Sequence, residues 1–166
     1  MLQLGRILGQ LHNVGENRTF DKRPTINADD FIIKPAEYLL TQNFIPADLE
    51  TAYSSLVQDL TKRTQICFEQ AGHVNALRLH GDCHHGNVLT RDEHFFIVDF
   101  DDARSGPAIQ DIWMFLSGDR HYMTSRLNDF MDGYKEFRHF NPAELHLLEA
   151  LRTFRLIHYA SWLAPR

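Results

Sequence analysis

Hydrophobic residues recur at helical spacing at the start of the chain. They fall three or four positions apart, which predicts a helix with one apolar side that ends near Gly15. The residues of this side are Leu4, Ile7, Leu8 and Leu11. Because the pattern begins without a preceding cap or loop, we expect either that a further segment normally precedes it or that an internal methionine serves as the start. The polar residues 16–30 then predict a loop.

Two prolines predict the starts of the next helices. Proline is favoured in the first turn of a helix, where its missing N–H has no partner to lose. Pro35 can therefore open a short helix through Phe44, and Pro46 can open a longer one through Gln70.

Short apolar stretches replace the helical pattern from Ala76 onward. They are too short for helices and predict small strands, the last two joined as a hairpin by the polar turn 90–94. The expected strands are 77–79, 88–89 and 95–98.

Helical patterns return after Pro107. Asn141 and Glu144 have the spacing of a capping box at the start of the last helix. The expected helices are 110–116, 123–137 and 141–165. The predicted fold class is therefore α+β, mostly helical, with a small central β-hairpin.

Composition narrows the range of functions. With 166 residues, 43% of them hydrophobic, the chain can form one domain over 1–166 with its own core. A net charge of −5 argues against nucleic acid or an anionic membrane as a partner. An anionic ligand would therefore need a positive charge close to its binding site, most simply a metal ion. The chain has two cysteines and no apolar run of about 20 residues, which favours a reducing compartment, the cytoplasm.

Acidic and amide residues gather at the ends of the predicted strands. Asp82 precedes Asn87 by five positions, and Asp99 follows the hairpin. Phosphoryl transfer from ATP needs a divalent metal to neutralise the phosphate oxygens and a carboxylate to orient or deprotonate the acceptor hydroxyl. Asp and Asn oxygens suit Mg²⁺. The spacing H-x-D-x-x-x-x-N, followed by a strand and Asp-Phe, is the outline of a kinase catalytic loop and metal-binding pair.

The residues of these two motifs resemble those of a known protein family. The run His-Gly-Asp-Cys-His-His-Gly-Asn from His80 and the run Asp-Phe-Asp-Asp from Asp99 resemble the aminoglycoside phosphotransferase and choline kinase superfamily. Within it, the chain is most similar to bacterial serine/threonine protein kinases of the stress response. The resemblance covers the whole chain and implies the C-terminal lobe of a protein-kinase-like fold, with ATP as phosphoryl donor and Mg²⁺ as cofactor.

The resemblance also implies a role for each motif residue. Asp82 would be the catalytic base, and His80 would brace its loop. Asn87 and Asp99 would bind Mg²⁺. Asp111 would anchor the catalytic loop from the helix that follows.

Two further residues have less specific roles. Asp101 would either contact the residues that bind the ligand or contact the ligand directly. Arg104, close after the metal motif, is a candidate for contact with substrate or phosphate.

Other parts of a kinase are not evident before His80. A complete kinase has a glycine-rich strand–turn–strand over the phosphates and a lysine paired with a helix glutamate. Gly5 and Gly9 lie in a helical pattern, and Lys34, the alternative ATP lysine, is followed at once by Pro35. We therefore expect a C-terminal lobe without its N-terminal lobe, and the ATP-binding residues stay unknown.

Several alternatives remain open at this point. The acceptor could be a protein hydroxyl or a small alcohol such as an aminoglycoside, choline or homoserine, and the complete protein is expected to be a monomer. A truncated, non-catalytic remnant that binds partners is another interpretation. A zinc site would need a second Cys/His pair at finger-like spacing; its ligands would be His80, Cys83, His84 and His85. Hydrophobic residues near Asp111 are expected in the core: Trp113, Phe115 and Leu116.

Overall fold

The computed structural model describes residues 1–92 and 94–166. Most described residues are helical, and the strands are short. The chain forms two compact units, each built from two separated stretches. The first unit contains Met1–Thr25 and Val74–Glu144, and the second contains Ile26–His73 and Leu145–Arg166. No helix among the described residues combines the length and the apolar character needed to cross a bilayer.

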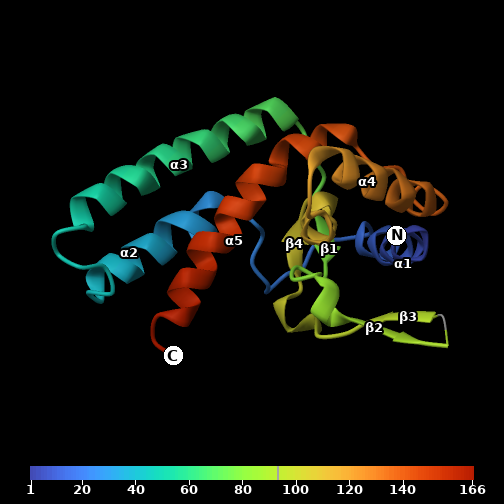
Figure 1. Ribbon diagram of the computed structural model, residues 1–166, viewed down its shortest axis with the longest axis horizontal. Helices are drawn as coiled ribbons and strands as arrows, with labels where there is room; N and C mark the ends of the chain where they lie inside the picture. Colours follow the sequence, from blue (N-terminus) through green and yellow to red (C-terminus); the bar gives the residue numbers. More distant parts are fainter. Residues whose placement is uncertain (93) are drawn as a thin grey trace. The chain divides into compact units, whose positions relative to one another are not determined.

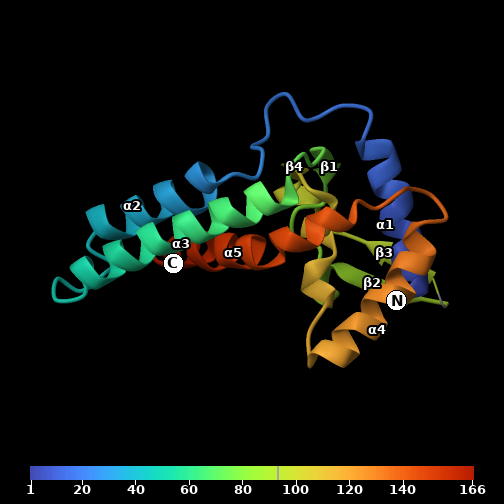
Figure 2. The ribbon, with the colours of Figure 1, turned by 90° about the horizontal axis from the view of Figure 1, so that it is seen from above.

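In the first unit, α1 (Leu2–Gly15) and α4 (Arg120–Tyr134) pack side by side (Figures 1 and 2). Glycine lets the two backbones touch. A Cβ atom at Gly5 would lie 2.0 Å from the carbonyl oxygen of Phe130, and one at Gly133 would lie 2.1 Å from a carbonyl oxygen of α1. Gly5 of the first helix and Gly133 of α4 therefore serve helix packing.

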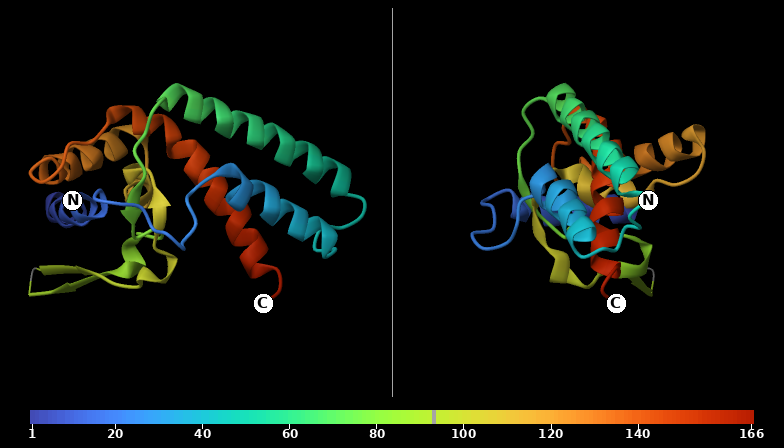
Figure 3. Two further views of the ribbon diagram at one scale, coloured as in Figure 1. Left: turned by 180° about the vertical axis from the view of Figure 1, so that it is seen from behind. Right: turned by 90° about the vertical axis from the view of Figure 1, so that its left-hand side faces the viewer.

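Two small antiparallel sheets lie in the same unit. β2 (Val88–Arg91) and β3 (His94–Ile97) form the predicted hairpin (Figure 3), and the predicted turn between them includes residue 93, which lies outside the described residues. β1 (Leu77–Leu79) pairs with β4 (Arg104–Gly106). The sequence did not predict β4, because Arg-Ser-Gly has no apolar pattern and its strand character comes from pairing with other segments, chiefly β1.

The helix predicted for 110–116 is wrong in type. Two short 3-10 helices, Ala108–Asp111 and Trp113–Phe115, take its place. The side chains of Gln110 and Asp111 both bind the backbone that follows β1, which holds this segment in tight turns. The core placement is confirmed, because the three predicted residues are buried: Trp113, Phe115 and Leu116.

The predicted capping box is half formed. The Asn141 side chain accepts a hydrogen bond from the Ala143 N–H at 3.1 Å, as an N-cap should. Glu144 instead accepts from the Ile109 N–H at 3.0 Å. The segment Pro142–Leu147 is 3-10 helical, and α5 begins after it (Leu148–Leu163).

The second unit consists of α2 (Lys34–Thr41), α3 (Glu50–Ala71) and α5, which run alongside one another (Figure 2). Phe31 and Phe68 stack on Phe154, with ring centroids 6.1 and 5.9 Å apart. A π-helical turn at Asp29–Ile33 ends the predicted 16–30 loop early.

Lys34 lies in the first turn of α2, where its ammonium group forms an ion pair with Asp30 one turn earlier. A kinase ATP lysine is carried by a strand under a glycine-rich loop. The position of Lys34 on a helix therefore differs from the one that the alternative assignment requires.

Candidate active site

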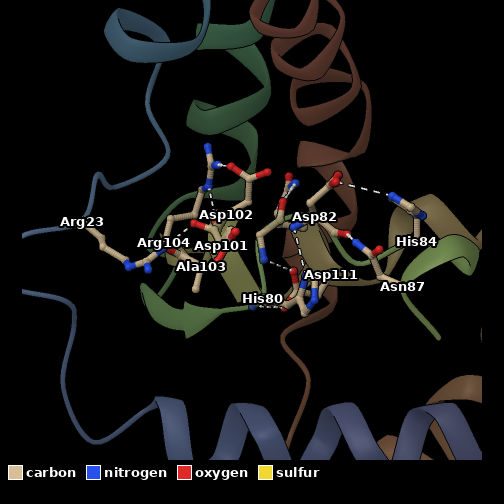
Figure 4. A network of polar contacts seen from close by, with 12 residues as sticks. Arg23, His80, Asp82, His84, Asn87, Asp101, Asp102, Ala103, Arg104 and Asp111 are labelled. Carbon is tan, nitrogen blue, oxygen red and sulfur yellow. Dashed lines mark hydrogen bonds and ion pairs between the residues drawn. The ribbon is translucent and has the colours of Figure 1, made fainter. Parts of the chain in front are cut away.

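The loop after β1 carries the predicted base, Asp82 (Figure 4). His80, which is fully buried, connects this loop to the end of the hairpin. Its Nε2 lies 2.8 Å from the Val98 carbonyl oxygen, and its Nδ1 accepts from the Asp82 N–H at 3.3 Å. A carbonyl can only accept, so the proton of His80 is on Nε2. Both ring nitrogens are therefore used in shaping the loop.

Asp111 binds the backbone of the same loop. Its carboxylate is fully buried and accepts from the His80 N–H and the Gly81 N–H, each at 2.8 Å. The neighbouring Gln110 donates to the Gly81 carbonyl at 2.8 Å. Gly81 has φ +88°, and a Cβ atom there would lie 2.2 Å from the Asp102 carbonyl oxygen, so glycine is required. Asp111 therefore holds the backbone of this loop, and the catalytic role that the resemblance implies for the loop stays a prediction.

Two residues that the sequence did not identify complete this buried network. His12 Nε2 lies 3.1 Å from the Asp111 carboxylate, and His12 Nδ1 lies 2.9 Å from the Tyr134 hydroxyl. Burial raises the pKa of Tyr134, so its hydroxyl keeps its proton and can donate to or accept from Nδ1. The Asp111 carboxylate can only accept, so the proton between it and His12 is on Nε2. One feature of the sequence could have indicated His12: it lies four positions after Leu8, on the side of α1 that is buried.

Glu144 binds the backbone of the short 3-10 helix Ala108–Asp111, which carries Asp111. Burial raises the pKa of its carboxyl group, and hydrogen bonds from the backbone of Ile109 and Ala108 oppose that rise. The group thus fixes the start of the turn that ends in Asp111. The sequence did not show this role, because the capping-box spacing accounted for Glu144 locally.

Asn87 lies at the base of the hairpin and joins the two predicted motifs. Its side-chain N–H donates to the Asp82 carbonyl at 3.0 Å, and its own carbonyl accepts from the Val98 N–H at 3.1 Å. Since the amide nitrogen is used in the first bond, the amide oxygen is the atom that can bind a cation. The second bond brings Asn87 beside the segment that carries Asp99.

Asp99 follows β3 and has a left-handed backbone, with φ 66° and ψ 68°. This conformation costs a residue with a side chain on the order of 1 kcal/mol, although aspartate tolerates it better than most. A short 3-10 helix, Phe100–Asp102, comes next. The turn directs the chain away from the hairpin immediately after the predicted metal ligand.

The Asn87 and Asp99 oxygens are hard ligands that fit Mg²⁺, which accepts one or two protein carboxylates and fills its shell with phosphate and water. Among the described residues, no three or more His, Cys, Asp or Glu side chains are grouped to hold a metal. A pair of such oxygen ligands can hold a cation whose remaining ligands are phosphate or water.

Arginines surround the turn after Asp99 (Figure 4). Arg104 is largely buried; its Nε donates to the Asp102 carbonyl at 2.7 Å, and its guanidinium forms an ion pair with the Asp102 carboxylate. Arg23 donates to the carbonyls of Asp101 and Ala103. No motif in the sequence marks Arg23. The role of Arg104 toward substrate stays a prediction, and its contacts place it in support of the turn.

The histidines and the cysteine of the loop are used in other ways than in a zinc site. His84 accepts from the Gly86 N–H at 2.9 Å through Nδ1, and its Nε2 lies 3.4 Å from the Asp82 carboxylate. Burial raises the pKa of the Cys83 thiol, which opposes the thiolate that zinc needs. His85 packs edge-on against Phe115.

The chain matches a known protein family over most of its length. The sequence profile of the Phosphotransferase enzyme family matches residues 1–148. Stress response kinase A of Escherichia coli K12 is 40% identical over 166 residues, which is 100% of this chain and 50% of that protein. Serine/threonine protein kinase RdoA of Salmonella typhimurium is also 40% identical, with the same coverage. The chain thus spans about half the length of these curated relatives.

Solved structures share the fold. Amicoumacin kinase hAmiN, in complex with AMP-PNP, Ca²⁺ and Ami, aligns with a TM-score of 0.71 and 18% identity, covering 99% of this chain and 51% of that one. Spectinomycin phosphotransferase APH(9)-Ia, in complex with ADP and spectinomycin, aligns with a TM-score of 0.61 and 14% identity, covering 98% and 54%. These matches confirm the predicted kinase-like fold class.

Proposed function

Since the chain belongs to the phosphotransferase enzyme family, we propose that it carries the catalytic centre for Mg²⁺-dependent transfer of the γ-phosphoryl group of ATP to serine or threonine hydroxyls of proteins. The observation that supports this most is a pair of hydrogen bonds that Asn87 makes: its side chain donates to the Asp82 carbonyl, and its own carbonyl accepts from the N–H of Val98, the residue before Asp99. The setting that we propose is a bacterial stress response in the cytoplasm.

Asp82 is the proposed base. The acceptor oxygen forms a bond to the γ-phosphorus while the bond from that phosphorus to the bridging oxygen of ADP breaks, and the hydroxyl proton passes to the Asp82 carboxylate. His84 presents its Nε2–H to one oxygen of this carboxylate, because Nδ1 already accepts from Gly86.

Asn87 and Asp99 are the proposed magnesium ligands. When bound with ATP, the ion neutralises charge on the phosphate oxygens. The chain's own contribution is to fix these two ligands at the base of the hairpin, Asn87 just before β2 and Asp99 just after β3, with the Val98 backbone bonded to both His80 and Asn87. Fixed ligands reduce the reorganisation that the reaction would otherwise need.

The proposed acceptor follows from the sequence relatives. Stress response kinase A and RdoA are each 40% identical to this chain, and the second carries the name of a serine/threonine protein kinase. The solved kinases with small-molecule names are 14 to 18% identical and support the fold alone. A small alcohol as acceptor is the competing outcome, because it would use the same Asp82 chemistry.

The test is transfer of radiolabelled γ-phosphate by the protein as its gene encodes it, offered a protein mixture or a metabolite mixture. We expect Mg²⁺-dependent label on serine and threonine of proteins, and much less with Asp82→Asn. Label only in small alcohols would overturn the protein acceptor. Label in neither mixture would overturn the proposed function.

A further inference from the structure

Residues 19–25, which precede the second unit in the sequence, are hydrogen-bonded to β4. We call residues 19–25 the β4-flanking segment. The Phe20 N–H donates to the Ser105 hydroxyl at 3.1 Å, and the Ser105 N–H donates to the Pro24 carbonyl at 3.1 Å. Thr25 forms a parallel bridge with Ser105. A stretch that the sequence predicts to be loop is therefore bonded near both of its ends to one residue of β4, Ser105.

Arg23 extends from this segment to the turn after Asp99 (Figure 4). Its Nη1 donates to the Asp101 carbonyl at 2.6 Å and to the Ala103 carbonyl at 3.0 Å. Hydrogen bonds from a charged donor are stronger than neutral ones. One guanidinium nitrogen thus joins the backbone on both sides of Asp102, about 80 positions further along the chain.

The turn needs such support because Asp99 has a left-handed backbone. A strained residue persists only where its surroundings fix the chain on both sides. Before Asp99, the Val98 backbone is bonded to His80 and Asn87. After Asp99, the side chains that bond to the backbone carbonyls of residues 101–103 are Arg23 and Arg104, among the contacts described.

We infer that Arg23 is a positioning residue for the metal-binding aspartate: it fixes the backbone after Asp99 and thereby directs the Asp99 carboxylate toward the cation. The inference rests on the proposed function. Lysine is a poor substitute in this position, since a single ammonium on a flexible stem lacks the planar, preorganised donors of guanidinium.

The test compares Arg23→Ala and Arg23→Lys with Lys22→Ala, which removes an exposed positive charge from the adjacent position. Rates are measured against Mg²⁺ concentration in the protein as its gene encodes it. We expect Arg23→Ala to need on the order of tenfold more Mg²⁺ for half its maximal rate, as is typical when a residue supporting a metal ligand is lost. Arg23→Lys should be intermediate and Lys22→Ala normal. Millimolar guanidinium should restore part of the rate of Arg23→Ala only.

Hydrogen–deuterium exchange of residues 98–104 in the same variants gives a readout that does not depend on catalysis. Faster exchange in Arg23→Ala, together with the shifted Mg²⁺ dependence, supports the inference. An unchanged Mg²⁺ dependence in an active Arg23→Ala protein overturns it. A wild-type protein without phosphoryl transfer overturns the proposed function and, with it, any role of Arg23 in metal positioning. Faster exchange would in that case leave Arg23 with a purely structural role.

Discussion

Asp82 is partly exposed at the end of a loop whose shape other residues determine. His80, Asp111 and Asn87 bind the backbone around it, so a change of its side chain should leave the loop intact. Asparagine keeps the size of aspartate and removes its basicity.

We therefore expect Asp82→Asn to lower the maximal rate by a factor on the order of 10² or more, with the KM for ATP nearly unchanged. Steady-state kinetics measure both constants. Asp92→Asn is a matched control, because Asp92 is exposed and has a positive φ of 49° that asparagine also tolerates. A collapse of nucleotide affinity at an unchanged maximal rate would make Asp82 a binding residue instead of the base.

The residues that the sequence predicted are those whose role depends on local spacing. Asp82, Asn87 and Asp99 belong to motifs that can be recognised within about 20 positions. His12 and Arg23 act on partners 99 and 78 positions away. No local pattern marks such pairs, because folding brings the partners together.

The contact between helices α1 and α4 depends on glycine. Alanine at an ordinary helix position usually stabilises a helix relative to glycine. Gly5→Ala should do the opposite, because its Cβ atom would meet the Phe130 carbonyl oxygen.

We expect Gly5→Ala to lower the free energy of unfolding by about 2 kcal/mol or more, measured by urea denaturation. Gln10→Ala, at an exposed position of the same helix, should change it little. A stabilised Gly5→Ala protein would show that the two helices do not pack through their backbones.

Glu144 predicts a pH dependence of stability. Burial raises its pKa in the folded protein above the ordinary 4.5. A raised pKa contributes stability that is fully present below the unfolded pKa and is lost as the pH rises through the folded pKa. Glutamine does not titrate and can still accept from Ile109.

The free energy of unfolding of Glu144→Gln should therefore rise relative to that of the wild type as the pH increases from 4.5 through the folded pKa of Glu144. Urea denaturation at a series of pH values measures the difference, with the exposed Asp48→Asn as control. A difference that is constant with pH, or that falls, would contradict the assignment of Glu144 as a buried acid.

Elements with strong periodicity or apolar runs were predicted, as α1 and the β2–β3 hairpin illustrate. β4 was missed because its strand character comes from its partner. The 110–116 segment was given the wrong helix type because side-chain bonds from Gln110 and Asp111 to the catalytic loop determine its backbone. Tertiary contacts override local propensity in both places.

At the scale of the molecule, each compact unit combines two stretches that are far apart in the sequence. Composition predicted enough apolar material for a core but could not predict this pairing, which depends on contacts such as Phe31 with Phe154. The described residues contain the predicted base and metal ligands, whereas Lys34 is on a helix beside Asp30.

Residues 1–166 by themselves should therefore transfer phosphate slowly, on the order of 10²-fold or more below a form that also carries a nucleotide-covering lobe before Met1, because positioning of the phosphates is the main source of rate in this reaction. Phosphate transfer by the two forms at equal concentration measures the difference. Equal, robust rates would show that Lys34 or another group of this chain completes the nucleotide site.

The most direct test of the account is Mg²⁺-dependent transfer of the γ-phosphate of ATP by the wild type, Asp99→Ala and Asp99→Asn, in the protein as its gene encodes it. Asparagine tolerates the left-handed backbone of Asp99, so it separates loss of the carboxylate from backbone strain. We predict Mg²⁺-dependent transfer by the wild type and a loss on the order of 10²-fold or more in both variants, while the exposed Asp21→Ala retains the wild-type rate. Full activity in either Asp99 variant would contradict the assignment of this loop and hairpin as a magnesium-dependent phosphotransferase centre.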